Sequence, residues 1–276
     1  MSKRPEIAIP PEKLCIKLPK GTFSYSQYGL YHRCGKAYEF RYVRGIKSPP
    51  AGPALKGTSL HAGVEAAHVH VMKHKTLPSA EEIRAVVADE FTRGASEVEN
   101  WGEDNPGKAK DATIAAYGTY HRDALPRVNP VAAEQPFVLY LNEEIPVTGF
   151  IDLIDQAPVE GGTPGDPGEI IVADLKYSGS SWSQRDIDID PQFTLYAKVV
   201  GASKVRVDNV VDLKKGPTFK QLTSTRDGKM HLTLLEHMAE TVDSIGQGHF
   251  PKTAIDDPMC SEKWCGYWKM CRGKHR

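Results

Sequence analysis

Two charged residues close an apolar run in IIVADLKYS, residues 170–178. Asp174 and Lys176 flank Leu175, so in a β-strand both charged side chains point to the same face. Burying an unpaired carboxylate or ammonium group costs several kcal/mol. The two groups therefore need each other, a surface position, or a cation and an anionic substrate, and the sequence favours the last of these.

A second carboxylate, Asp152, ends the stretch GFID, residues 149–152, which precedes this strand along the chain. If the two strands are adjacent, Asp152 and Asp174 meet at one end of a sheet. Carboxylate oxygens are hard ligands that suit Mg²⁺, and a bound cation contacts a phosphate oxygen and lowers the pKa of an attacking water. Lys176 is placed to hold that water and to offset the charge that develops on phosphorus.

These residues resemble a known family. GFID followed by ADLK resembles the paired acidic and D/E-x-K motifs of the PD-(D/E)xK nuclease superfamily, with Asp174 where Glu is commoner. GTSLH, residues 57–61, resembles the G-x-x-x-H motif of the RecB-like branch, and QFTLY, residues 192–196, resembles its Q-x-x-x-Y motif. The motifs also occur in the order that is typical of that branch.

The resemblance implies a role for each motif residue. It gives Mg²⁺ or Mn²⁺ four ligands: His61, Asp152, Asp174 and the backbone carbonyl of Leu175. It gives catalytic roles to Asp152, Asp174, Lys176, Gln192 and Tyr196. Taken one by one, the residues also have structural interpretations, because His61 could be a satisfied helix histidine, Asp152 a turn residue, and Asp174 with Lys176 a surface ion pair.

Four of the five cysteines form a further set. Cys260, Cys265 and Cys271 lie close together near the C-terminus, and Cys34 lies far upstream. Members of the RecB-like branch with one cysteine before the nuclease core and three after it, such as CRISPR-associated exonucleases, hold a [4Fe–4S] cluster, and the resemblance implies one here. Four residues separate Cys260 from Cys265, where the family more often has two. Spacing alone also suits Zn²⁺, whereas disulfides are disfavoured and Cys15 is interpreted as a free thiol.

Composition and charge place few limits on function. The chain has 276 residues and a formal net charge of zero, with basic segments at residues 33–47, 204–220 and 263–276. Such segments are typical of a nucleic-acid channel, although solvated surface is an equally good interpretation of each one alone. There is no apolar stretch long enough to span a membrane and no signal-peptide pattern, so we expect a cytoplasmic protein of a bacterium or of a phage host.

Hydrophobic periodicity predicts the elements that position these residues. It predicts helices at residues 59–75, 79–99, 109–125, 190–201 and 229–248, and strands at residues 134–155 (a hairpin turning at 142–144), 169–178 and 204–213. Ser59 and Ser79 are the expected N-caps of the first two helices, and a Gly/Pro-rich loop at residues 160–168 precedes the third strand.

This order predicts a single α/β domain with a mixed central sheet flanked by helices, and the resemblance implies a restriction-endonuclease-like core. We expect an N-terminal arm at residues 1–21 and a nuclease domain at residues 22–276. Within that domain, residues 57–213 form the core, and residues 22–56 and 252–272 carry the cluster that ties the terminal segments together.

The expected function is a Mg²⁺- or Mn²⁺-dependent DNA exonuclease. Its expected substrate is single-stranded DNA or duplex ends, in recombination, repair or phage DNA processing, with a recombination protein or helicase as a candidate partner and no membrane association. The oligomeric state is left open. The alternative is a non-catalytic iron–sulfur or zinc module that binds DNA or a recombination partner.

Overall fold

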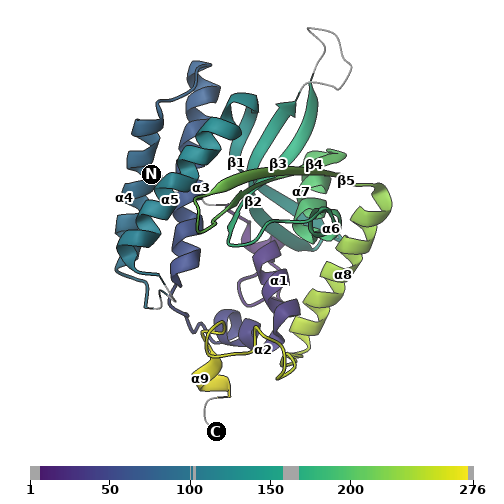
Figure 1. Cartoon of the computed structure of the whole chain (residues 1–276). Coiled ribbons are helices and arrows are strands. Elements are labelled where there is room, and N and C mark those ends of the chain that lie inside the picture. The colour runs from purple at the N-terminus through teal and green to yellow at the C-terminus, as the bar shows by residue number, and fades with distance from the viewer. Residues whose placement is uncertain (1–6, 100, 102–103, 158–167, 273–276) are drawn as a thin grey trace. The chain divides into compact units, whose positions relative to one another are not determined.

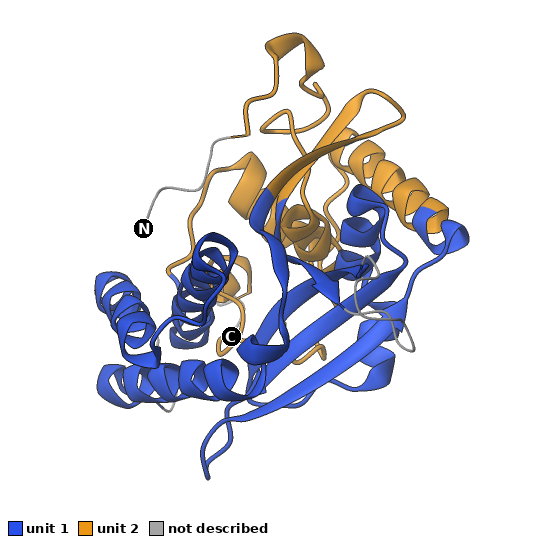
Figure 2. Ribbon diagram, turned by 90° about the horizontal axis from the view of Figure 1, so that it is seen from above, with its two compact units in different colours: residues 1–5, 50–135, 150–231 blue, residues 6–49, 136–149, 232–276 orange. Residues whose placement is uncertain are grey.

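The computed structural model describes residues 7–99, 101, 104–157 and 168–272. Its described residues group into two compact units, shown in blue and orange in Figure 2. The first unit contains residues 50–135 and 150–231, and the second contains residues 7–49, 136–149 and 232–272. All but the last residue of the predicted Gly/Pro-rich loop lie outside the described residues.

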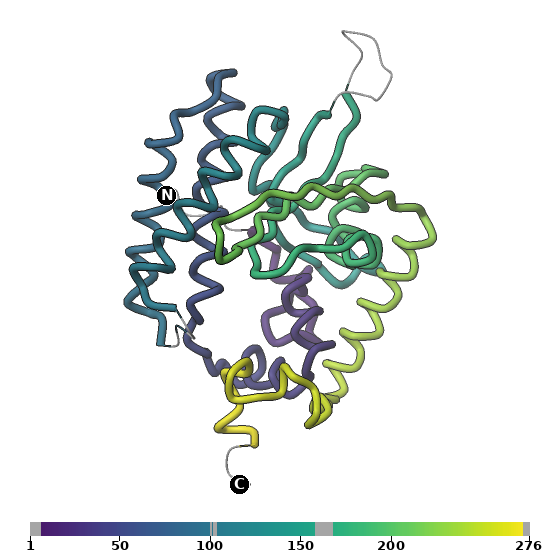
Figure 3. The backbone as a smooth tube through the Cα atoms, viewed as in Figure 1, coloured from purple at the N-terminus to yellow at the C-terminus, as the bar shows by residue number. Residues whose placement is uncertain are grey.

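Three helices of the first unit lie side by side (Figures 1 and 3). They are α3 (Gly52–His74), α4 (Ala80–Ala95) and α5 (Pro106–Asp123). Their apolar residues form one core with the neighbouring strands, in which Leu60, Val87 and Tyr117 are fully buried. Leu175 and Val210 contribute to this core from the sheet, so the three helices cover one face of it.

The central sheet has five strands in the order β1-β2-β3-β4-β5. The strands are β1 (Pro130–Leu141), β2 (Ile145–Ala157), β3 (Glu169–Ser178), β4 (Lys204–Val211) and β5 (Thr218–Thr225). The β3–β4 pair is parallel, whereas the β2–β3 and β4–β5 pairs are antiparallel. The sheet is therefore mixed, and the predicted α/β class with a mixed sheet flanked by helices is confirmed.

Two helices connect β3 to β4, namely α6 (Gln184–Ile189) and α7 (Pro191–Val200). Helix α7 packs on β3 and β4, and its Gln192 contacts Lys176, which alternates along β3 with the core residue Leu175. It therefore covers the face opposite α3–α5. Asp190 caps its N-terminus, and Gly201 ends it with a left-handed backbone (φ 75°), as predicted.

The second unit contains the N-terminal helices and the C-terminal segment. Its main helices are α1 (Tyr25–Arg33), α2 (Gly35–Tyr38), most of α8 (Gly228–Gly246) and α9 (Trp268–Cys271), with short helical turns at Pro11–Lys13 and Glu39–Val43. The backbone of Phe23 bonds to Pro146 and Thr148 of the β1–β2 hairpin at 2.8 and 2.9 Å. The fully buried Phe23 and Tyr38 contribute to its core.

Several local predictions can be compared with these elements. Ser79 caps α4 as predicted, because its hydroxyl accepts the Glu82 N–H. The predicted N-cap role of Ser59 is wrong: α3 begins seven residues earlier at Gly52, with a proline in its first turn, and Ser59 is buried inside the helix. Helices α1 and α2 and the edge strand β5 were not predicted. No helix among the described residues has both the length and the apolar character to cross a membrane.

We expect Gly63→Ala to destabilise the protein by about 1–3 kcal/mol, because the new methyl group would collide with Cγ2 of Val87 where α3 packs on α4. Gly57 is a matched control in the same helix, since a Cβ there meets no atom within 4 Å. Gly57→Ala should increase stability by about 0.5–1 kcal/mol through its higher helix propensity. Urea unfolding of both variants measures the difference, and equal effects of the two changes would contradict this packing.

Candidate functional site

The site forms where β2 and β3 part. Their antiparallel register runs from Ala157 opposite Glu169 to Leu153 opposite Ala173, and Asp152 and Asp174 come next on the two strands. Beyond this point the Leu175 N–H bonds to Oδ2 of Asp152 at 3.3 Å. The N–H and C=O groups of one strand residue point in the same direction, so the Leu175 carbonyl also faces the side of Asp152.

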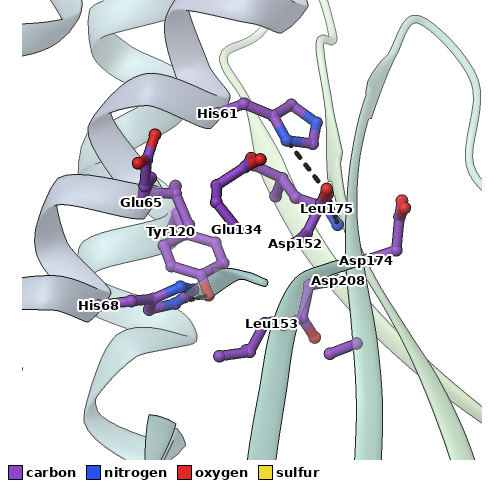
Figure 4. A pocket seen from close by; sticks show the side chains of 12 residues that line it. His61, Glu65, His68, Tyr120, Glu134, Asp152, Leu153, Asp174, Leu175 and Asp208 are labelled. Atoms are coloured by element: carbon purple, nitrogen blue, oxygen red, sulfur yellow. Dashed lines mark hydrogen bonds and ion pairs between the residues drawn. The ribbon is translucent and has the colours of Figure 1, made fainter. Parts of the chain in front are cut away.

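Helix α3 supplies His61 to this site. Nδ1 of His61 lies 3.1 Å from Oδ2 of Asp152. Figure 4 shows His61, Glu65 and His68 along one side of α3, lining the same pocket. Their spacing of four and then three residues places them on one helix face. Glu65 and His68 were not predicted as site residues, although their spacing from His61 is the signal that could have identified them.

Glu134 on β1 completes a close set of ligand atoms. One ligand atom each from His61, Glu134 and Asp152 lies within 4.8 Å of the others, and Figure 4 shows the three side chains pointing toward one another. Glu134 is buried and has a left-handed backbone with φ 47°, which is strained for a residue that is not glycine. Glu134 was not predicted as a site residue, because nothing in the sequence spacing distinguishes it from the other acidic residues near β1.

The donor chemistry of this set fits a divalent cation. Two carboxylates and one imidazole suit Mg²⁺ or Mn²⁺. The pocket that they line holds about 10 Å³ of space, which is the size of one water or one ion. With Asp174 included, three carboxylates adjoin the cationic groups of His61 and Lys176, so a cation would also reduce the excess negative charge.

Lys176 lies on the face of β3 that α7 covers. Its Nζ lies 2.7 Å from Oδ2 of Asp174 and donates to Oε1 of Gln192 at 2.7 Å. Nε2 of Gln192 in turn donates to the Tyr196 hydroxyl at 3.0 Å, as their i, i+4 spacing on α7 allows. The structure therefore joins the predicted residues Asp174, Lys176, Gln192 and Tyr196 in one chain of contacts.

The predicted ligand set is only partly gathered. His61 and Asp152 are in contact, whereas the Asp174 carboxylate pairs with Lys176 and points away from the His61–Glu134–Asp152 group (Figure 4). Ligand roles for Asp174 and for the Leu175 carbonyl stay predictions.

Burial and neighbouring charges act on these groups in opposite directions. Burial raises the pKa of Asp174 and the Asp152 carboxylate raises it further, to about 6, despite the opposing effect of Lys176. Burial also tends to raise the pKa of Asp152, but His61 outweighs it and the pKa is lowered. Burial lowers the pKa of His61, yet Asp152 dominates and raises it to about 9.

Further buried polar residues adjoin the pocket, and His68, Tyr120 and Asp208 line it. Arg206 on β4 donates to both carboxylate oxygens of Asp208 at 3.0 and 3.1 Å and also pairs with Asp155. Nε2 of His68 lies 2.9 Å from the Tyr120 hydroxyl, and burial lowers the pKa of His68 to about 4. His68 is therefore neutral, and both Asp155 and Asp208 are engaged by Arg206.

Three of the four predicted cluster cysteines, Cys34, Cys260 and Cys265, line one pocket of about 170 Å³ in the second unit. Cys34 ends α1, and Cys271 lies on α9. Burial raises the pKa of Cys265, and the nearby thiols of Cys34, Cys260 and Cys271 raise it further. Among the described residues their sulfur atoms are less closely gathered than the ligand atoms of His61, Glu134 and Asp152.

We expect Asp174→Asn to stabilise the metal-free protein at pH 7.5. The folded-state pKa of Asp174 is about 6 against an ordinary 3.8, so the stability that its protonated form contributes is complete below pH 3.8 and is lost as the pH rises through 6. The amide of the variant does not ionise, so it does not lose this stability, which amounts to about 1–3 kcal/mol. Thermal unfolding in EDTA between pH 4 and 8 measures this effect. The melting temperature of the variant should rise relative to that of the wild type as the pH increases.

Asp152→Asn is the matched control, because the pKa of Asp152 shifts in the opposite direction. This change should destabilise the protein at pH 7.5, since it removes the carboxylate that pairs with His61. If both amide variants shifted the melting temperature in the same direction, the charge arrangement described above would be wrong.

The fold of this chain is similar to that of a solved structure. The crystal structure of a predicted exonuclease from Eubacterium rectale superimposes with a TM-score of 0.53 at 13% sequence identity, covering 86% of each chain. The crystal structure of SSO0001 gives a TM-score of 0.35 at 14% identity, covering 79% of this chain and 85% of the other. No curated protein sequence matches the chain.

The family itself is shown by sequence. Residues 22–272 match the model of the PD-(D/E)XK nuclease superfamily, which spans the site residues from His61 to Tyr196 as well as the four cysteines. The chain therefore belongs to the PD-(D/E)XK nuclease superfamily.

Proposed function

We propose that this protein is a divalent-metal-dependent DNA exonuclease that hydrolyses phosphodiester bonds. The observation that carries the proposal is that Asp174, which pairs with Lys176, lines the same pocket as the close ligand set His61–Glu134–Asp152. Membership of a nuclease superfamily supports the same chemistry. The exonuclease designation of the structurally similar Eubacterium rectale protein supports attack from DNA ends.

His61, Glu134 and Asp152 would hold the metal, with Asp174 and the Leu175 carbonyl as further candidate ligands. A bound Mg²⁺ or Mn²⁺ supplies Lewis acidity and lowers the pKa of a coordinated water. The mixed histidine and carboxylate donors also suit Mn²⁺ well. Because the pKa of metal-free His61 is about 9, this residue must lose a proton before it can act as a ligand near neutral pH.

Lys176 would act on the scissile phosphate and the attacking water. Burial tends to lower its pKa, but Asp174 dominates and raises it, so the ammonium stays charged. Asp174 and Gln192 fix its position, with Tyr196 holding Gln192. A fixed ammonium group stabilises the charge that accumulates on phosphorus without reorganising first. The products would be a 5′-phosphate and a 3′-hydroxyl.

We expect Lys176→Ala to reduce cleavage at least about 100-fold, because it removes a preorganised charge at the reacting phosphate. End-labelled single- and double-stranded DNA, incubated with Mn²⁺, Mg²⁺ or EDTA and resolved on gels, measures the loss and gives the polarity of digestion.

Lys198→Ala is the matched control for this assay, because Lys198 is an exposed lysine on the same helix as Gln192 and Tyr196. It should cleave like the wild type. Full activity of Lys176→Ala would refute the proposed site. Tight DNA binding by a wild type that cleaves no DNA with either metal would instead support the non-catalytic DNA-binding alternative.

We also propose that the four cysteines bind a [4Fe–4S] cluster. The pocket lined by Cys34, Cys260 and Cys265 supports a metal centre, as does the effect of the other three thiols on the pKa of Cys265. A tetrahedral Zn²⁺ site with bonds of about 2.3 Å would need more closely gathered sulfur atoms. The centre would be structural, because it would link α1 to the C-terminal segment within the second unit.

Anaerobically purified protein should then be brown and contain about four iron atoms per chain. Cys265→Ala should lose the colour and the iron, and the residues around its pocket should become more sensitive to protease. Cys15→Ala is the control and should keep both, because Cys15 does not line this pocket. A colourless wild type with one equivalent of zinc would replace the cluster by a zinc site.

A further inference from the structure

Trp182 lies beside the lysine of the proposed site. It belongs to the loop between β3 and α6, and its ring centroid is 5.7 Å from Nζ of Lys176. Phe193 packs edge-on against it, with the ring centroids 6.1 Å apart and the planes at 83°. The side chain is only partly buried. An aromatic ring that is partly open to solvent therefore lies next to Lys176 and is packed against the fully buried Phe193.

The backbone of Trp182 is fixed by two neighbouring strands. Its N–H donates to Oδ1 of Asn209 at 2.9 Å, and its carbonyl accepts from Nζ of Lys220 at 3.0 Å. The fully buried Asn209 also donates from Nδ2 to the Lys176 carbonyl at 3.2 Å. One asparagine thus sets the position of both the catalytic lysine and the tryptophan, so the distance between them does not depend on a loose loop.

The charges around the ring suit a polyanion. Nζ of Lys176 lies over the ring, Nζ of Lys220 bonds to the backbone carbonyl of Trp182, and Arg185 is exposed on the helix that follows. Both acidic residues of that helix are engaged: Asp186 accepts from the backbone and hydroxyl of Ser183 in a capping box, and Asp188 accepts from Gln184 and Ser224. An incoming phosphate would therefore meet cationic groups next to an aromatic surface.

We propose that Trp182 stacks on the base of the nucleotide that adjoins the scissile phosphate, at a single-stranded DNA end. The inference rests on the proposed nuclease function and adds the group that holds the substrate's base. Stacking on an indole is tolerant of sequence, because every base offers a π-face, and it requires the base to be unpaired. Trp182 would thus favour single-stranded ends over paired ones without reading sequence.

The test is a four-way binding cycle. Wild type and Trp182→Ala are titrated, with Ca²⁺ in place of Mg²⁺, against a fluorescent single-stranded oligonucleotide and against copies with one abasic residue at each of the first four positions from either end. Trp182→Ala should weaken binding of the intact strand roughly 5- to 100-fold. An abasic residue at one position should weaken wild-type binding similarly and should barely weaken the variant further.

Two substitutions at the same position serve as controls. Trp182→Phe keeps a π-face and should retain most of the affinity, whereas Trp182→Leu keeps only apolar bulk and should behave like Trp182→Ala. Thermal unfolding identifies any variant that fails to fold. In that case the abasic series on the wild type still decides. If none of the abasic positions weakened binding more than the others, the inference would be overturned.

A different result would show that Trp182 only positions Lys176. Trp182→Ala would then lower the cleavage rate and leave binding of intact and abasic strands equal, which also overturns the inference. A wild type that shows the stacking cycle in Ca²⁺ but cleaves no DNA with Mg²⁺ or Mn²⁺ would refute the nuclease proposal alone. A wild type that binds no single strand would refute stacking, whatever its activity on duplex ends.

Discussion

The burial of unlike charges at the point where β2 and β3 separate is the constraint on which this site depends. Asp174 is buried and Asp152 and Lys176 are partly buried on a sheet whose faces are covered by helices, where unpaired charges would be costly. Each is therefore matched: Asp152 by His61 and the Leu175 N–H, and Asp174 by Lys176. The helices must bring His61 from one face and Gln192 from the other for these charges to keep their partners.

The separation of the two strands has a chemical use as well. A continuous ladder would have engaged the Leu175 N–H with β2 backbone, whereas here it bonds to a carboxylate. The strained backbone of Glu134 adds a further carboxylate from β1. Beneath them, Arg206 holds Asp155 and Asp208 and so keeps two more acidic groups from adding to the charge of the pocket. In the metal-free protein the carboxylates of the site repel one another, and a bound cation would reduce this repulsion.

Much of this arrangement could be predicted from the sequence. The rest could not be predicted, for physical reasons. The apolar run in residues 170–178 predicted β3, and the geometry of a strand predicted the shared face of Asp174 and Lys176. The four-residue spacing of Gln192 and Tyr196 places both on one face of α7, where they are in contact. Glu134 could not be predicted, because its role arises from a left-handed backbone and from packing between distant segments. Trp182 and β5 were missed for a similar reason: a loop residue and an exposed edge strand carry little periodicity.

The alternation of β3 also restricts how this chain can change in length. Leu175 faces the core of α3–α5, while its two charged neighbours face the other way. Inserting or deleting one residue upstream within the strand would turn Lys176 into that core and Leu175 toward Gln192. Related chains can therefore vary β3 by substitution, but gains and losses of residues are confined to the loops that precede and follow it.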